Sequence, residues 1–349
     1  MVNPAAILPA AALVPLATAA LYPGVTTDNH SCVLSEPVLS CSADAVPGKV
    51  DTCCSETFGG LVLQTQFWDV YTGFESEGQI LPQKSWTIHG LWPGKRQNSY
   101  LGRPFHLLTI SPPPDFCNGS YTQYCDLNRQ YDPKPSPNTT TGTPSGTPVP
   151  PYKGESIDKW FAPYGKSDLL AWMNKHWIAQ GDRNWVLWAH EYSKHATCFS
   201  TFQTECFGPK ANKYDDLFEF FETVISYYKD LPTWHWLANA GIKPSNTTAY
   251  SLSHIQDALK TGYGKVPYLG CGGPKYNETA AGKGSGDSGR TQFQEVWYYN
   301  HVVGRVQSKD VVRVDADVEG GSLGNCAKAD NAIWYYKRAK GSETTGCQK

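Results

Sequence analysis

Eleven cysteines constrain the fold of this 349-residue chain more than any other feature of its sequence. So many thiols without a C-x-x-C pair are typical of a disulfide framework rather than of metal sites, which implies an oxidising compartment. Cys53 and Cys54 are adjacent. Their Cα atoms lie about 3.8 Å apart, whereas an unstrained bridge requires roughly 4.4–6.8 Å. We therefore expect these two cysteines to tie one segment to two different places.

The N-terminus agrees with an oxidising compartment. An apolar run from Ala5 to Leu21 contains an A-x-A-like cleavage site, which predicts a signal peptide over residues 1–19 although no Lys or Arg precedes it. The run is too short and too rich in Ala and Pro to favour a membrane span. N-x-S/T sequons predict glycosylation at some of five positions, which are Asn29, Asn118, Asn138, Asn246 and Asn277. The sequence therefore predicts a secreted glycoprotein that does not enter a membrane.

The formal net charge of −2 is not that of a protein that holds nucleic acid by releasing counterions. A nucleic acid partner would have to be held briefly, at a local site.

Strand-forming and helix-periodic segments follow one another without regular alternation, which favours an α+β fold. We expect a single disulfide-bonded domain over residues 31–330, with a central antiparallel sheet packed with several helices, followed by a C-terminal extension over residues 331–349. Residues 185–188 fit either a buried strand or the first turn of a buried helix. The remaining predicted strands are 61–68, 86–91, 295–306 and 311–314, and the predicted helices are 167–179, 214–229 and 253–259, with Ser167 and Ser253 as caps.

Residues 132–151 are rich in Pro, Thr, Ser and Gly. We interpret this segment as a flexible surface loop inserted within the domain, because its composition cannot build a core. No side chain in it is a candidate catalytic group.

Two short segments carry the side chains that can perform chemistry, WTIHGLWP at residues 86–93 and HEYSKHATC at residues 190–198. On a helix, side chains four positions apart are neighbours. A carboxylate beside an imidazole raises its basicity and fixes its orientation, and a lysine supplies positive charge for a phosphoryl group. The second segment would form two such neighbouring pairs, Glu191 with His195 and His190 with Lys194.

Two other interpretations compete for these segments. A zinc site of the H-E-x-x-H type requires histidines four apart, but His190 and His195 are five apart. At about 100° per residue this spacing turns them away from a shared face. The second segment alone is equally compatible with a surface helix that carries incidental charges, and His89 alone with a structural histidine.

Together the two segments resemble the active-site blocks of the ribonuclease T2 family, the secreted acid ribonucleases of fungi, plants and animals. The family blocks read W-x-x-H-G-L-W-P and H-E-W-x-K-H-G-T-C. This chain matches the first block fully and departs from the second at Tyr192 for Trp and Ala196 for Gly. Gly94 stands where some fungal members carry an adenine-reading Asp, so a purine preference does not follow. The resemblance covers roughly Ser31 to Cys326.

The resemblance implies a metal-independent endoribonuclease that needs no cofactor and forms 2′,3′-cyclic phosphates from RNA but not from DNA. His195 resembles the general base and His89 the general acid. Other residues match groups that stabilise the phosphorane (Glu191, Lys194) or bind substrate (His190, Trp92, Gln66). A monomer is expected. The alternative is a catalytically silent secreted glycoprotein of the same fold, for which Ala196 would matter if the site needs a positive φ.

The resemblance also implies a disulfide pattern that satisfies the argument from the adjacent cysteines. It leaves Cys347 free or bonded to another molecule. The implied pairs are Cys32–Cys54, Cys41–Cys117, Cys53–Cys206, Cys125–Cys198 and Cys271–Cys326.

Overall fold

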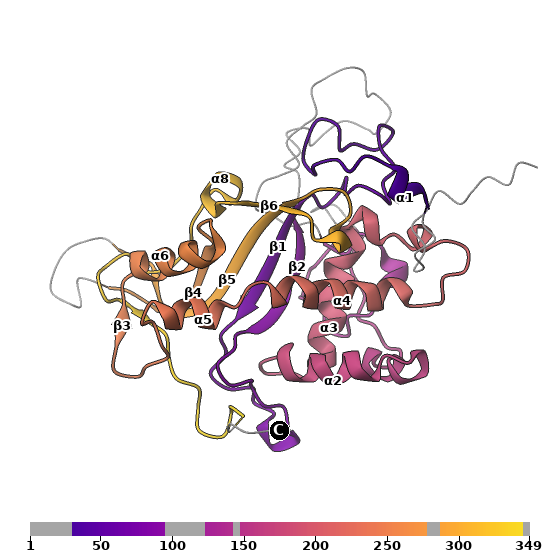
Figure 1. Ribbon diagram of the computed structural model, residues 1–349. Coiled ribbons are helices and arrows are strands. Elements are labelled where there is room, and N and C mark those ends of the chain that lie inside the picture. The colour runs from indigo at the N-terminus through magenta and orange to yellow at the C-terminus, as the bar shows by residue number, and fades with distance from the viewer. Residues whose placement is uncertain (1–29, 95–122, 142–146, 278–286, 345–349) are drawn as a thin grey trace, which may run out of the picture.

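The computed structural model describes residues 30–94, 123–141, 147–277 and 287–344, which are drawn in colour in Figure 1. Several sequence predictions fall outside these ranges. They are the signal peptide over 1–19, the sequons at Asn29 and Asn118, and the cysteines Cys117 and Cys347.

The centre of the molecule is a seven-stranded sheet in which β2, β1, β5, β7 and β3 follow one another, while β4 and β6 also pair with β5. The pairings between these strands are antiparallel apart from a single parallel pair between β5 and β7. The strands are β1 (Leu61–Phe67), β2 (Thr87–Gly94), β3 (Ala249–Tyr250), β4 (Tyr268–Lys275), β5 (Arg290–Val302), β6 (Val311–Val314) and β7 (Ile333–Trp334).

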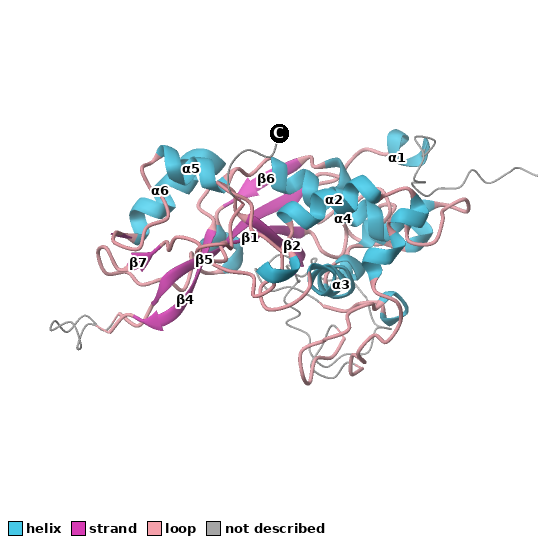
Figure 2. Cartoon of the chain, turned by 90° about the horizontal axis from the view of Figure 1, so that it is seen from below, coloured by secondary structure: helices cyan, strands magenta, loops and turns pink. Residues whose placement is uncertain are grey.

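Helices gather at the two ends of this sheet. Figure 1 shows α5 and α6 at one side of the strands and α2, α3 and α4 at the other, and Figure 2 shows the same two groups from below. The helices are α1 (His30–Leu34), α2 (Ser167–His176), α3 (Asn184–Lys194), α4 (Asp215–Lys229), α5 (Thr233–Asn239), α6 (Leu252–Tyr263) and α8 (Ala316–Gly320). The α+β fold with a largely antiparallel sheet, predicted from the sequence, is confirmed.

The two faces of the sheet carry different side chains. On one face, Val62 and Ile88 pack into a large core with α3 and α4, and Val296 packs into a second core with α5 and α6. On the other face, Leu63 and Trp92 belong to a smaller cluster. Because side chains alternate along a strand, the register of β1, β2 and β5 decides which residues reach this second face.

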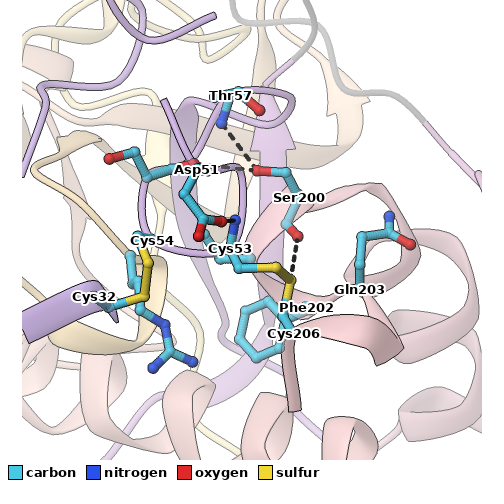
Figure 3. Close-up of a disulfide and its surroundings, with 12 residues drawn as sticks. Cys32, Asp51, Cys53, Cys54, Thr57, Ser200, Phe202, Gln203 and Cys206 are labelled. Carbon is cyan, nitrogen blue, oxygen red and sulfur yellow. Dashed lines mark hydrogen bonds between the residues drawn. A yellow bond between two sulfur atoms is a disulfide. The ribbon is translucent and has the colours of Figure 1, made fainter. Parts of the chain in front are cut away.

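Four disulfides join described residues, Cys32–Cys54, Cys53–Cys206, Cys125–Cys198 and Cys271–Cys326, as the resemblance implied. Cys41 is also disulfide-bonded, but its predicted partner Cys117 lies outside the described residues. Figure 3 shows the bridge from Cys53 to Cys206 beside Ser200, whose Oγ accepts a hydrogen bond from the Thr57 amide at 3.0 Å. The adjacent cysteines thus have two different partners: Cys54 closes a bridge within the N-terminal segment, and Cys53 connects this segment to Cys206.

Several predicted boundaries differ from the structure. The strand expected to stop before Pro93 continues to Gly94, because β2 lies at the edge of the sheet formed by the described residues, a position where proline is tolerated. Residues 185–188 form the start of α3 rather than a strand. Ser167 is the first residue of α2, after Lys166 at the N-cap. Helix α6 begins at Leu252, before the predicted cap Ser253.

The C-terminal residues join the sheet as well. Ile333 and Trp334 form β7, and Tyr335 is fully buried. Part of the predicted C-terminal extension is therefore built into the sheet and its core.

Candidate active site

A β-bulge in the edge strand β2 directs His89 toward the second face of the sheet. Gln66 pairs with Ile88 and Thr65 pairs with Gly90, so His89 is the extra residue between them. Its ring stacks on Phe67 at a centroid distance of 3.7 Å. The backbone oxygen of His89 accepts a hydrogen bond from Trp177 Nε1 at 2.9 Å. The stacked ring of Phe67 therefore fixes the imidazole on one face, and the hydrogen bond from Trp177 fixes the backbone of His89.

Helix α3 supplies the other charged groups from its C-terminal half. Its apolar side chains, such as Trp188 and Tyr192, are buried in the core, and His195 is the C-cap residue. The backbone oxygen of Lys194 accepts a hydrogen bond from the Tyr124 amide at 2.9 Å, and the disulfide from Cys125 to Cys198 follows directly. These contacts hold the end of α3 against the segment around residue 125.

The carboxylate of Glu191 is the centre of the site. Its Oε1 lies 3.6 Å from His89 Nε2, and its Oε2 lies 3.9 Å from His195 Nε2. Trp92 Nε1 donates a hydrogen bond to Oε2 at 2.8 Å. A Cβ atom on Gly90 would lie 1.7 Å from the same oxygen. Glycine at this position therefore allows the carboxylate to approach the strand that carries His89.

His195 is almost completely buried, with a side chain that is 1 % exposed. Its ring stacks on Trp92 at 5.1 Å between centroids. Burial, followed by the nearby charges of Lys194, His190 and His89, holds the pKa of His195 well below its usual 6.5. Its environment therefore favours the neutral imidazole, the form that can accept a proton.

His190 forms a hydrogen bond with Asp132, a residue that the sequence analysis did not identify. Its Nδ1 donates a hydrogen bond to Asp132 Oδ2 at 2.7 Å, and Tyr124 donates its hydroxyl to the same oxygen at 2.6 Å. Burial alone would raise the pKa of Asp132, but the hydrogen bonds from His190 and Tyr124 lower it below its usual 3.8.

Asp132 is the first residue of the segment predicted to be a flexible surface loop without a role at the site. The described parts of 132–151 contain neither helix nor strand, as predicted for a loop. The backbone oxygen of Asp132 accepts a hydrogen bond from the Tyr152 amide at 2.8 Å, so the two ends of the segment meet at the site. Asp132 therefore contacts a predicted site residue, although the sequence offered no candidate catalytic group in this segment.

Glu295 is a second missed residue. It lies on β5 opposite Phe67, and its Oε1 is 2.5 Å from Nδ1 of His89. The two side chains are 206 positions apart in the chain, so neither motif contains the glutamate. The only signal in the sequence was a carboxylate among the apolar residues of a predicted strand.

The structure brings most of the predicted site residues together. His89, Glu191, His195 and Trp92 contact one another, and the rings of His190 and His195 lie 6.4 Å apart. Lys194 follows on the same helix and is half-buried. Trp92 is 5 % exposed, because it packs between His195 and its other aromatic neighbours.

Gln66 is separate from this group. It is fully buried, and its amide nitrogen donates to the backbone oxygen of Leu231 at 3.0 Å. Its side-chain oxygen accepts from Thr233 at 2.6 Å. Gln66 therefore faces α5, on the side of the sheet opposite to Trp92.

Both departures from the family blocks fit the structure. Ala196 begins a buried 3₁₀ turn and is not among the residues with positive φ, so its methyl group meets no backbone restriction. Tyr192 donates its hydroxyl to buried Asp216, which also binds Arg129 at 3.2 Å. The hydroxyl group of Tyr192, which a tryptophan lacks, thus fixes the smaller ring in the core.

In the described ranges, no group of three or more His, Cys, Asp or Glu side chains has the arrangement of a metal site. None of the helices described there is both long and apolar enough to cross a bilayer.

Comparisons with known proteins find several fungal ribonucleases. Ribonuclease Le2 of Lentinula edodes is 33 % identical over 81 % of this chain and 89 % of its own length. Ribonuclease Trv of Hypocrea rufa is 31 % identical over 83 % of this chain and 93 % of its own length. Against ribonuclease T2-like 1-A of Candida albicans, at 30 % identity, the chain spans 56 % of the longer protein.

The fold matches as well. The crystal structure of Actibind, described as a T2 ribonuclease, superposes with a TM-score of 0.59 at 26 % identity and covers 86 % of this chain and 96 % of its own. The model of the ribonuclease T2 family matches residues 59–314, which include both active-site blocks. The chain therefore belongs to the ribonuclease T2 family, which confirms the endoribonuclease class predicted from its sequence.

Proposed function

We propose that this protein cleaves single-stranded RNA by transesterification, with His195 as the general base and His89 as the general acid. The observation that carries the proposal is the position of one buried carboxylate, Glu191, between the Nε2 atoms of both histidines at 3.6 and 3.9 Å. General acid–base catalysis requires two groups in opposite protonation states on either side of the reacting centre. Two imidazoles around a fixed carboxylate suit this requirement.

In the first step, neutral His195 takes the proton of the ribose 2′-OH, and the oxygen attacks the neighbouring phosphorus. The bond from phosphorus to the 5′-oxygen then breaks, and His89 donates a proton from Nε2 to that oxygen. The products are a 2′,3′-cyclic phosphate and a free 5′-OH. The low pKa of His195 supports its role as the base, because it keeps the ring unprotonated before the reaction.

The remaining site residues would bind substrate or offset charge. Lys194 supplies positive charge for the pentacovalent phosphorane. Glu191, between the two imidazoles, also helps to stabilise the phosphorane, and His190, oriented by Asp132, binds a phosphate oxygen. The roles of Trp92 in stacking on a nucleobase and of Gln66 in contacting the substrate remain predictions. Both side chains are buried in the structure.

The same proposal includes the environment of the enzyme. Four disulfides support an oxidising compartment, and we propose that the protein is secreted, as a monomer, and glycosylated at some of its sequons. We propose that RNA is its substrate, that DNA is not, and that neither a metal nor another cofactor takes part.

One experiment tests the chemistry. The enzyme is incubated with an RNA oligonucleotide and the matching DNA, each with and without EDTA, and the new ends are identified by mass spectrometry. We expect RNA cleavage in both buffers, ends that carry 2′,3′-cyclic phosphate before 3′-phosphate, and intact DNA. Cleavage of DNA, loss of activity in EDTA, or products with only 5′-phosphates would each refute the proposed reaction.

Single substitutions test the assignment of residues. Replacement of His195 or His89 by Ala should lower kcat by roughly 10²–10⁴, the usual contribution of one proton-transfer group. Folded variants with wild-type rates would show that the assigned site is wrong.

A further inference from the structure

We infer that Glu295 is a positioning residue for the general acid, because it binds Nδ1 of His89 and leaves Nε2 to carry the transferred proton. This inference rests on the proposed role of His89. It assigns a function to a strand residue that lies outside both active-site blocks.

The geometry of His89 is set on three sides. Glu295 Oε1 lies 2.5 Å from Nδ1, and Phe67 covers one face of the ring at 3.7 Å. Nε2, at the opposite edge of the ring, faces Glu191 at 3.6 Å. Glu295 and Phe67 are directly paired across β5 and β1, so the carboxylate and the stacking ring reach His89 from neighbouring strands on one face of the sheet.

Hydrogen-bonding chemistry then decides which nitrogen exchanges its proton. An ionised carboxylate can only accept hydrogen bonds, so its partner Nδ1 must carry a hydrogen. The hydrogen bond made by one ring nitrogen thereby fixes the role of the other. With Nδ1 permanently protonated, Nε2 holds the second proton in the imidazolium form and releases it to the leaving 5′-oxygen. Glu295, in contact with Nδ1, stabilises the positive imidazolium.

A third carboxyl group near this histidine, besides Glu295 and Glu191, is less suited to the task. Asp69 is buried, and burial raises its pKa to about 7 although Arg338 and His89 act in the opposite direction. In mildly acidic solution Asp69 is therefore mostly neutral. Glu295 is partly exposed, with a side chain at 18 %, and makes the direct contact with the ring.

A comparison of two substrates separates positioning of the acid from a general structural effect. A dinucleoside monophosphate releases an alkoxide, which requires protonation as it leaves. A nucleoside 3′-(4-nitrophenyl phosphate) releases a stable phenolate, which does not. Loss of the general acid should therefore slow the first reaction much more than the second, whereas loss of the base should slow both.

We expect Glu295→Gln to lower kcat on the dinucleoside monophosphate by about 10- to 100-fold, which is less than or at most equal to the lower end of the roughly 10²–10⁴-fold that a general acid contributes. On the nitrophenyl ester its kcat should stay within about threefold of wild type, and KM should change little on either substrate. Glu295→Asp, which keeps a carboxylate, should retain more activity than Glu295→Gln. Glu222→Gln, which removes an exposed carboxylate paired with Lys166, should match wild type.

The outcomes distinguish the inference from the function on which it rests. Equal losses on both substrates, or wild-type rates on both, in folded Glu295→Gln would overturn the positioning role. If His89→Ala itself shows equal losses on the two substrates, the proposed role of His89 fails and the inference fails with it. If His89→Ala shows the difference between substrates and Glu295→Gln does not, only the inference about Glu295 fails.

Discussion

Burial of His195 predicts a component of stability that depends on pH. The unfolded chain exposes this imidazole with an ordinary pKa of about 6.5, whereas in the folded protein burial, Lys194, His190 and His89 hold the pKa well below that value. Between the two values the unfolded chain binds more protons than the folded chain. The free energy of unfolding therefore falls as the pH drops below about 6.5, and this loss stops once the folded-state pKa is passed.

The magnitude follows from proton linkage. A single group contributes about 1.4 kcal/mol for each pH unit between its two pKa values. The side chain is 1 % exposed, so solvent screening requires no large correction. His195→Gln removes the titration, and the difference in unfolding free energy should shift in favour of the variant by about 1.4 kcal/mol per unit as the pH falls below about 6.5.

Urea denaturation of both proteins, at intervals of about one pH unit from neutral to about pH 4.5, measures this difference. Lost packing against Trp92 lowers the stability of the variant at every pH, so only the change with pH carries information. His254→Gln is the matched control, because this histidine is exposed on α6 and should leave the pH dependence as in wild type. A difference between wild type and His195→Gln that does not change with pH would refute the reasoning.

Three further substitutions test how the site is held. Cys125→Ser should lower stability by roughly 2–5 kcal/mol, measured by urea denaturation, because it opens the disulfide that follows α3. Gly90→Ala should fold but lose most RNA cleavage in a turnover assay, because its Cβ would displace the Glu191 carboxylate. Tyr192→Phe should cost roughly 1.5–3 kcal/mol of stability, because it removes a donor from buried Asp216, with kcat nearly unchanged.

Local patterns in the sequence predicted the fold class, and the resemblance to the two family blocks predicted which residues meet around Glu191. Residues 215–229 form one long amphipathic helix whose apolar face is buried, and the periodicity of such a helix is visible without any partner. The second active-site segment behaves likewise, since α3 places side chains four residues apart beside one another.

Elements that depend on distant partners could not be predicted in this way. Strand β4 contains three glycines and a proline, a composition that disfavours strands, and is stabilised by its pairing with β5. Helix α5 has only seven residues, too few for a clear period. Asp132 lies 58 positions from His190 and Glu295 lies 206 positions from His89. A local sequence pattern cannot predict a contact between residues that are so far apart in the chain.

The histidines of the two blocks and the carboxylates that bind them are far apart in the sequence. A protein of this fold could therefore lose activity without any change in the blocks. The two blocks encode the histidines, but the carboxylates bound to Nδ1 of His89 and of His190 come from β5 and from the base of a loop. The hydrogen bond at one ring nitrogen determines the proton state of the other. A relative with both blocks intact could therefore be catalytically weak if Glu295 and Asp132 were replaced. In the proposed mechanism the blocks supply the reacting groups, and these two carboxylates hold the histidines in the state in which they react.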